Sequence, residues 1–194
     1  MLLRTFASSV AGIDAVTITI ELNLSRGVRF FLVGLPDVAV KESQQRIESA
    51  IRSLGFRWPG RQVVINMAPA DIRKEGSSYD LPLAIGILAA DEKVSGQQLD
   101  SFILIGELSL DGSLQPVRGV LPIAMRAREE KFRGVIVPEK NAREAAVVDG
   151  LGVGILPPDL QGQLLQEYKR ITGRKTTPNP FAIYRTSRYT SRRR

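Results

Sequence analysis

The segment from Tyr79 to Ala90 (YDLPLAIGILAA) constrains the fold more than any other part of the chain. Its apolar residues cover nearly the whole surface of a helix, so we expect this helix to be buried against a sheet. Pro82 is tolerated because it lies in the first helical turn. A chain of 194 residues that is 43% hydrophobic is long enough for one domain with a core of that kind.

Strand and helix patterns on both sides of this segment predict an α/β fold. Ala15 to Leu24 alternates apolar and polar residues as a half-buried strand does, and the turn-forming Ser25-Arg26-Gly27 predicts a hairpin with a strand at Val28 to Val33. Asp37 is a good N-cap for a helix that Gly55 ends. An antiparallel start followed by alternating strands and helices indicates an α+β two-layer sandwich with a mixed sheet.

Further elements are predicted along the chain. They are a strand at Arg61 to Met67, a hairpin of Phe102 to Leu108 and Ser113 to Val117 around Asp111-Gly112, helices at Val120 to Lys131 and Ala142 to Val148, strands at Gly134 to Val137 and Val153 to Leu156, and a last helix from Pro157 to Tyr168.

Composition and missing motifs exclude several functions. The chain has no cysteine and no histidine, which removes disulfides, thiolate chemistry and the commonest general base and metal ligand. No glycine-rich string followed by Lys and Ser or Thr is present, so we expect no phosphate-binding loop, no metal and no cofactor in this chain. No apolar run is long enough for a membrane span, and the first residues lack the features of a signal peptide, so we expect a cytoplasmic protein.

The positive charge is concentrated at the C-terminal end. The net charge is +7, but nine basic residues and no acidic one follow Glu167, which leaves about −2 for residues 1–168. Residues 169–194 have no hydrophobic period and contain two prolines, so they are expected to be a linker or disordered tail after a domain of residues 1–168.

The loop from Lys74 to Asp80 places serines at the start of the buried helix, where backbone dipoles can stabilise an oxyanion. Serine is also a preferred N-cap residue, so Ser77 or Ser78 is expected to satisfy amides of the first turn. Nucleophilic function would require a partner base.

Three long motifs in order resemble the N-terminal domain of the ComM/YifB family of bacterial AAA+ proteins, often labelled magnesium-chelatase-like. They are FFLVGLPDVAVKESQQRIESAI (Phe30 to Ile51), VVINMAPADIRKEGSSYDLPLAIGIL (Val63 to Leu88) and GELSLDGSLQPVRGVLPIA (Gly106 to Ala124). The resemblance implies the fold of the Lon proteolytic domain, which is that of the second domain of ribosomal protein S5. It also implies that the domain precedes an AAA+ motor, which would hold the ATP and magnesium, in proteins associated with DNA branch migration during natural transformation.

The resemblance to Lon allows a comparison of catalytic positions. Lon-like peptidases use a serine and a distant lysine as its base, and Lys74-Glu75-Gly76-Ser77-Ser78-Tyr79 matches the serine motif with Ser78 at the nucleophile position. In the second motif, Leu121 occupies the lysine position, and a leucine cannot accept the serine proton. The resemblance therefore implies a domain without peptidase activity.

Three functional hypotheses follow. The first is an assembly or substrate-contact module for an AAA+ motor acting on DNA. For this module we expect a homo-oligomer, which would be a hexamer in the full-length family, and no membrane partner. Its candidate contact residues are Asp71, Arg73, Lys74, Glu75 and Arg118. The alternative for this loop is an ordinary solvated connection. The second is a residual serine hydrolase that uses Ser78 with Lys74 as an unconventional base.

The third hypothesis makes the basic tail a nucleic-acid arm, because arginines alternate there with Tyr184 and Tyr189. The resemblance ends near Arg170, so truncation or a shifted reading frame is the other explanation of the tail. Both explanations are left open by the protein sequence.

Overall fold

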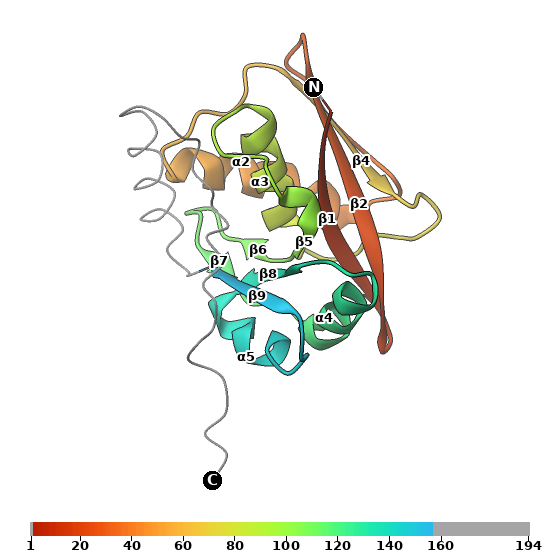
Figure 1. Cartoon of the computed structure of the whole chain (residues 1–194). Coiled ribbons are helices and arrows are strands. Elements are labelled where there is room, and N and C mark those ends of the chain that lie inside the picture. Colours follow the sequence, from red (N-terminus) through yellow and green to blue (C-terminus); the bar gives the residue numbers. More distant parts are fainter. Residues whose placement is uncertain (1, 157–194) are drawn as a thin grey trace.

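A seven-stranded mixed sheet organises the fold, which a computed structural model describes for residues 2–156 (Figure 1). The strand order is β3-β4-β2-β1-β5-β8-β9. The strands are β1 (Leu2–Ala11), β2 (Asp14–Ser25), β3 (Phe30–Val33), β4 (Gln62–Ala68), β5 (Phe102–Leu104), β8 (Gly134–Pro138) and β9 (Gly152–Leu156). The β1–β2 and β2–β4 pairs are antiparallel and the other four pairs are parallel. The predicted α/β class is confirmed.

Helices cover both faces of this sheet. They are α1 (Val38–Lys41), α2 (Ser43–Ser53), α3 (Asp80–Ala90), α4 (Val120–Glu129) and α5 (Ala142–Ala145), with 3-10 turns at Leu99–Ser101 and Glu139–Asn141. A separate hairpin joins β6 (Glu107–Leu108) to β7 (Leu114–Gln115). Every residue of α3 is buried, as its sequence predicts.

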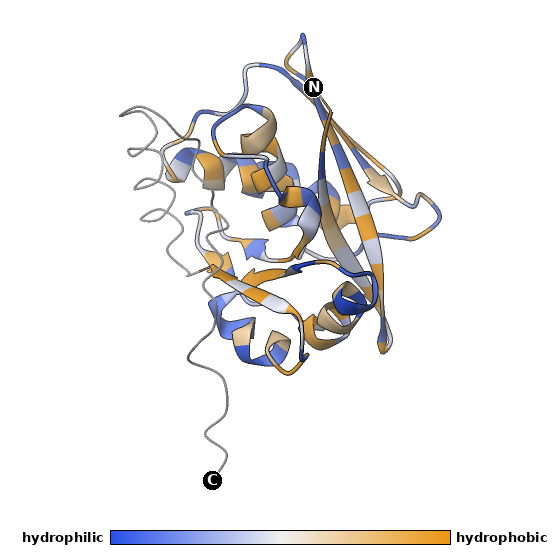
Figure 2. Cartoon of the chain, viewed as in Figure 1, coloured by the Kyte–Doolittle hydropathy of each residue, from blue (hydrophilic) through white to orange (hydrophobic). Residues whose placement is uncertain are grey.

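Alternation along the strands divides the apolar residues between two cores. On β5, Phe102 and Leu104 join the core beneath α2 and α3, whereas Ile103 faces a second core beneath α4 and α5. Figure 2 shows the same alternation of hydrophobic and hydrophilic residues along β2. The second helical layer extends the expected two-layer arrangement on the side of β5, β8 and β9.

One strand was missed and one strand pairing was predicted wrongly. The sequence patterns missed β1, and β3 does not form a hairpin with β2 but pairs in parallel with β4, which lies between them. The turn signal at Ser25-Arg26-Gly27 reports that the chain reverses and not which strand receives it. The two backbone edges of β4 bond different neighbours, β2 on one side and β3 on the other.

Other predictions are partly confirmed. Asp37 caps α1 as expected, but the helix predicted up to Gly55 is divided at Glu42 into α1 and α2. The strand predicted from Phe102 to Leu108 is interrupted at Ile105 and Gly106, and α5 ends at Ala145 rather than Val148. The helix predicted from Pro157 and the domain boundary at residue 168 lie outside the described residues.

Candidate functional site

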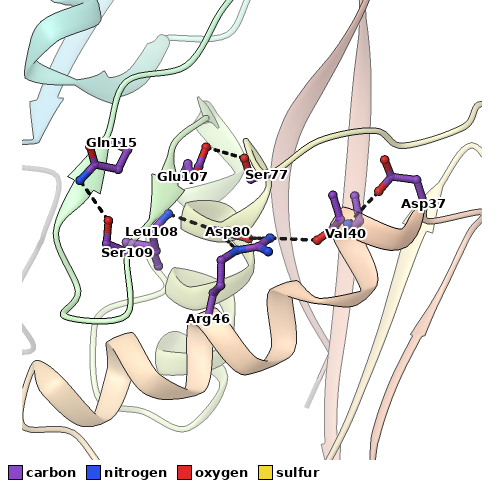
Figure 3. A network of polar contacts seen from close by, with 10 residues as sticks. Asp37, Val40, Arg46, Ser77, Asp80, Glu107, Leu108, Ser109 and Gln115 are labelled. Carbon is purple, nitrogen blue, oxygen red and sulfur yellow. Dashed lines mark hydrogen bonds and ion pairs between the residues drawn. The ribbon is translucent and has the colours of Figure 1, made fainter.

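The loop before α3 meets the turn after β3, and backbone hydrogen bonds fix the two segments together. Asp37 N donates to the Lys74 carbonyl over 2.9 Å, and Lys74 N donates to the Leu35 carbonyl over 3.2 Å. The Asp37 carboxylate accepts from Val40 N at 2.7 Å, which caps α1 (Figure 3). It also accepts from Gly76 N at 3.2 Å. Asp37 therefore hydrogen-bonds both the start of α1 and the loop of residues 74–80, which we call the serine loop.

A buried ion pair joins α2 to the start of α3. Arg46 Nε and Nη2 donate to the two carboxylate oxygens of Asp80 over 2.8 and 2.9 Å, and Leu108 N donates to the same carboxylate over 3.2 Å (Figure 3). Arg46 also donates to the Ala39 carbonyl. Burial raises the pKa of Asp80, against the opposing effect of the Arg46 hydrogen bonds, and the bond to Asp80 raises the pKa of Arg46.

The serines do not cap α3, so that prediction is wrong. Ser77 Oγ donates to Glu107 Oε2 over 2.5 Å, and the N-cap position of α3 is Tyr79, which makes no side-chain cap bond. The backbone gives the reason: Gly106 N donates to the Ser78 carbonyl and Leu81 N donates to the Gly106 carbonyl. The serine loop is thus held beside β6, where the Ser77 hydroxyl faces Glu107 and not the helix amides.

The two positions compared with Lon have different surroundings. Ser78 is half-buried, and its hydroxyl makes no hydrogen bond within the described part of the chain. Leu121 is the second residue of α4 and is 36% exposed, and its backbone N donates to Glu144 Oε1 over 2.9 Å. The apolar side chain of Leu121 supplies no proton acceptor.

The end of β1 lies near both helix starts. The Ser9 side chain lies beside Tyr79, which follows Ser78; burial raises the pKa of Tyr79 and Ser9 opposes that rise. The next residue, Val10, lies so close to Gly119 that a Cβ at Gly119 would be 3.0 Å from Val10 Cγ2. The structure therefore brings the starts of α3 and α4 to the same strand end.

Lys74 is fully buried, which corrects its prediction as an exposed contact residue. Its Nζ donates to the Pro69 carbonyl and not to Ser78, and burial lowers its pKa. The two backbone bonds that fix Lys74 beside Leu35 and Asp37 account for its inward position. The other predicted contact residues, Asp71, Arg73, Glu75 and Arg118, are exposed, and Arg73 pairs with Glu75 at 3.2 Å.

Sequence reasoning missed Arg46, Asp80 and Glu107 as interacting residues. A signal for the pair was present, because Arg46 falls on the same helical face as Ile47 and Ala50, and Asp80 begins an otherwise apolar helix. A single charge on each of two apolar faces indicates a buried ion pair. The Ser77–Glu107 contact has no comparable signal, since it depends on how β6 lies beside the loop.

Within residues 2–156, no three acidic or other metal-ligating side chains gather to hold a metal ion. Among the helices that the structure describes, none combines the length and apolar character needed to cross a bilayer.

The mixed sheet, the buried helix α3 and the serine loop define a domain of the Lon and magnesium-chelatase-like fold. The chain belongs to the family described as subunit ChlI of Mg-chelatase, whose model matches residues 20–141. This agrees with the resemblance to the N-terminal domain of ComM/YifB proteins.

Individual relatives support this assignment. The chain is 42% identical over 144 residues to the competence protein ComM of Haemophilus influenzae, covering 74% of this chain and 28% of that protein. It is 42% identical over 142 residues to YifB of Escherichia coli, covering 73% and 28%. Lon protease 2 of Bacillus subtilis is 27% identical over 144 residues, covering 74% and 25%. The chain thus spans less than a third of the length of these relatives.

Proposed function

We propose that this domain is non-catalytic and serves as an assembly or substrate-contact module for an AAA+ motor that processes DNA. The observation that carries the proposal is the pair of Leu121 and Ser78. In the motif comparison Leu121 takes the position of the lysine base of a Lon-like peptidase, and the Ser78 hydroxyl makes no hydrogen bond within the described residues. A serine nucleophile needs a base at about 2.6–3.2 Å.

The charged groups around the serine loop support a structural role for it. Glu107 accepts a hydrogen bond from Ser77, and Asp80 accepts hydrogen bonds from Arg46 and from Leu108 N. Asp37 accepts from two backbone amides. These carboxylates stabilise the loop, which presents Asp71, Arg73 and Glu75 to solvent. A rigid loop with exposed charges suits contact with a partner domain.

Association with a motor domain tests this role. We expect the chain to bind a separately produced AAA+ segment of a YifB relative, and the triple change Asp71→Ala, Arg73→Ala and Glu75→Ala to weaken binding at least tenfold in sedimentation velocity. The matched control changes Glu139, Lys140 and Asp149 to Ala, which are also exposed and carry the same net charge of −1. Absence of association, or equal loss in both variants, would refute the contact role.

A second function, residual serine hydrolysis by Ser78 and Lys74, is favoured by one observation. Burial lowers the pKa of Lys74, which is a property of lysine bases. However, its ammonium donates to the Pro69 carbonyl. We expect wild type and Ser78→Ala to react equally little with a fluorophosphonate probe. Labelling that Ser78→Ala abolishes would establish the hydrolase instead.

The variant Leu121→Lys tests whether the domain lacks only the lysine base or also the geometry that makes Ser78 reactive. If the serine retains a reactive position, this variant should label faster than wild type, and the double variant with Ser78→Ala should not label. No gain in Leu121→Lys would indicate that the site geometry, as well as the base, differs from that of Lon-like peptidases.

A further inference from the structure

Four arginines gather at one end of the sheet, on two neighbouring loops. Arg26 and Arg29 lie in the loop between β2 and β3, and Arg57 and Arg61 lie in the loop between α2 and β4. Both loops are at the top of the view in Figure 1, near the label N, and Figure 2 shows them largely in hydrophilic colours. We call these four residues the arginine cluster.

Strand pairing brings the two loops together. Ser25 pairs with Gln62 in the β2–β4 ladder, and Gln62 Nε2 donates to Ser25 Oγ. Val63 N donates to the Arg29 carbonyl over 2.8 Å. Since adjacent strands lie about 4.8 Å apart, Arg26 directly after β2 and Arg61 directly before β4 extend neighbouring strands. Phe30 and Trp58 follow Arg29 and Arg57 in the sequence, and their ring centroids are 6.2 Å apart. This aromatic contact brings the backbone at Arg29 close to the backbone at Arg57.

The arginine cluster is free of counter-charges. All four residues are exposed, and none of their side chains makes a hydrogen bond or ion pair within residues 2–156. No aspartate or glutamate occurs in residues 22–36 or 49–70. Residues 2–156 as a whole contain 18 acidic and 18 basic residues, with the four arginines included, so this cluster is a local excess of positive charge on a neutral domain.

From this arrangement we propose that the arginine cluster binds the phosphate backbone of a nucleic acid. The planar guanidinium group donates in a fork that matches phosphate oxygens, and all four cations are arginines rather than lysines. Exposed Val28 and half-buried Trp58 lie in the same loops and offer apolar surface for bases. The proposal rests on the proposed function in taking nucleic acid as the substrate, and it assigns the contact to a surface distinct from the serine loop.

The chemistry favours nucleic acid over an acidic protein. Interfaces between proteins usually combine both signs of charge around an apolar centre, whereas the arginine cluster has one sign only. Contacts with phosphates are independent of sequence and release counterions, so the binding constant should fall steeply with salt.

The test uses the full chain and fluorescein-labelled single-stranded and duplex DNA across a salt series. The variant changes Arg26, Arg29, Arg57 and Arg61 to Gln. The control changes Arg128, Lys131, Lys140 and Arg143 to Gln, which removes the same net charge. These residues are exposed in or next to α4 and α5, at the bottom of the view in Figure 1. Both variants keep residues 169–194, so any binding by that basic segment is common to them.

We expect the cluster variant to bind DNA at least tenfold more weakly than the control, and its slope of log K against log salt to be smaller by about 3. Equal binding by the two variants, or no DNA binding by wild type, overturns the proposal. Binding of polyglutamate that depends on the cluster, without such dependence for DNA, overturns it in favour of an acidic protein partner. If the chain fails to associate with the motor segment but still binds DNA through the arginine cluster, the assembly role is refuted and the DNA-binding proposal stands.

Discussion

At the residue scale, the buried carboxylate of Asp80 determines how α3 meets the rest of the fold. Its side chain has no exposed surface, yet it accepts two hydrogen bonds from Arg46 and one from Leu108 N. An unpaired charge in this position costs several kcal/mol. The three donors come from α2 and β6, so the ion pair defines the relative positions of three elements.

Removing the cation should therefore be costly. We expect Arg46→Met to lower the free energy of unfolding by about 3–5 kcal/mol, because it leaves Asp80 buried and unpaired. A further change of Asp80→Asn should recover part of that loss. Urea denaturation followed by circular dichroism measures both effects. The control is Arg52→Met on the same helix, whose exposed pair with Glu48 contributes less than about 1 kcal/mol; similar losses for Arg46→Met and Arg52→Met would contradict the prediction.

Lys74 predicts a pH dependence of stability. Because burial lowers its pKa below the ordinary 10.5, the unfolded chain binds the proton more tightly than the folded one. The stabilising contribution is present above 10.5 and is lost as pH falls through the lowered pKa. We expect the stability of wild type relative to Lys74→Met to rise with pH up to about 10.5, as measured by urea denaturation at a series of pH values. A difference that does not change with pH would contradict this.

At the element scale, the crossing from β3 to α1 depends on Gly34. Its φ is +102°, and a Cβ there would lie 2.0 Å from the Met67 carbonyl oxygen. This close approach to the end of β4 carries the chain into Leu35 and Asp37, whose backbone groups hydrogen-bond to Lys74. Only glycine fits because both the backbone conformation and the available space exclude a side chain.

The change Gly34→Ala should destabilise the fold by at least about 3 kcal/mol, since it combines backbone strain with a clash against backbone atoms. Gly12→Ala separates the two causes. Gly12 also has a positive φ, +66°, but a Cβ there meets nothing within 4 Å, so only strain of about 1–2 kcal/mol is expected. Thermal denaturation compares the two variants; equal losses would show that the approach to Met67 is not limiting.

At the scale of the whole molecule, one sheet supports two apolar cores. Neighbouring residues of β5 point into different cores, Ile103 beneath α4 and α5 and Leu104 beneath α2 and α3, and both are fully buried. Since each central strand contributes to both cores, a substitution in either core should lower the stability of one cooperative folding unit.

We expect Ile103→Ala and Leu104→Ala each to cost about 2–5 kcal/mol in one shared transition. Trp58, the only tryptophan, packs against the core beneath α2 and α3, whereas far-ultraviolet circular dichroism reports all elements. In the Ile103→Ala variant, fluorescence and circular dichroism should shift together. Separate midpoints for the two signals would show that the cores unfold independently.

The candidate site was predictable in part. The motif comparison located Ser78 and Leu121, and local chemistry identified Asp37 as a cap. The burial of Lys74 and the Ser77–Glu107 contact were not predictable, because each depends on segments about 30 or more residues apart in the sequence. The arginine cluster was missed because its members lie in two loops that only the pairing of β4 with β2 and β3 brings together.

The sequence by itself determined the α/β class, the buried helix α3, most element positions and the family, since these depend on local periodicity, capping residues and continuous motifs. The tertiary structure decided the order of the strands, the two-sided core, the pairing of Arg46 with Asp80 and the inward position of Lys74. The physical reason is that hydrophobic periodicity specifies which face of an element is buried but not which element covers it. Hydrogen bonds and charges between distant segments make that selection.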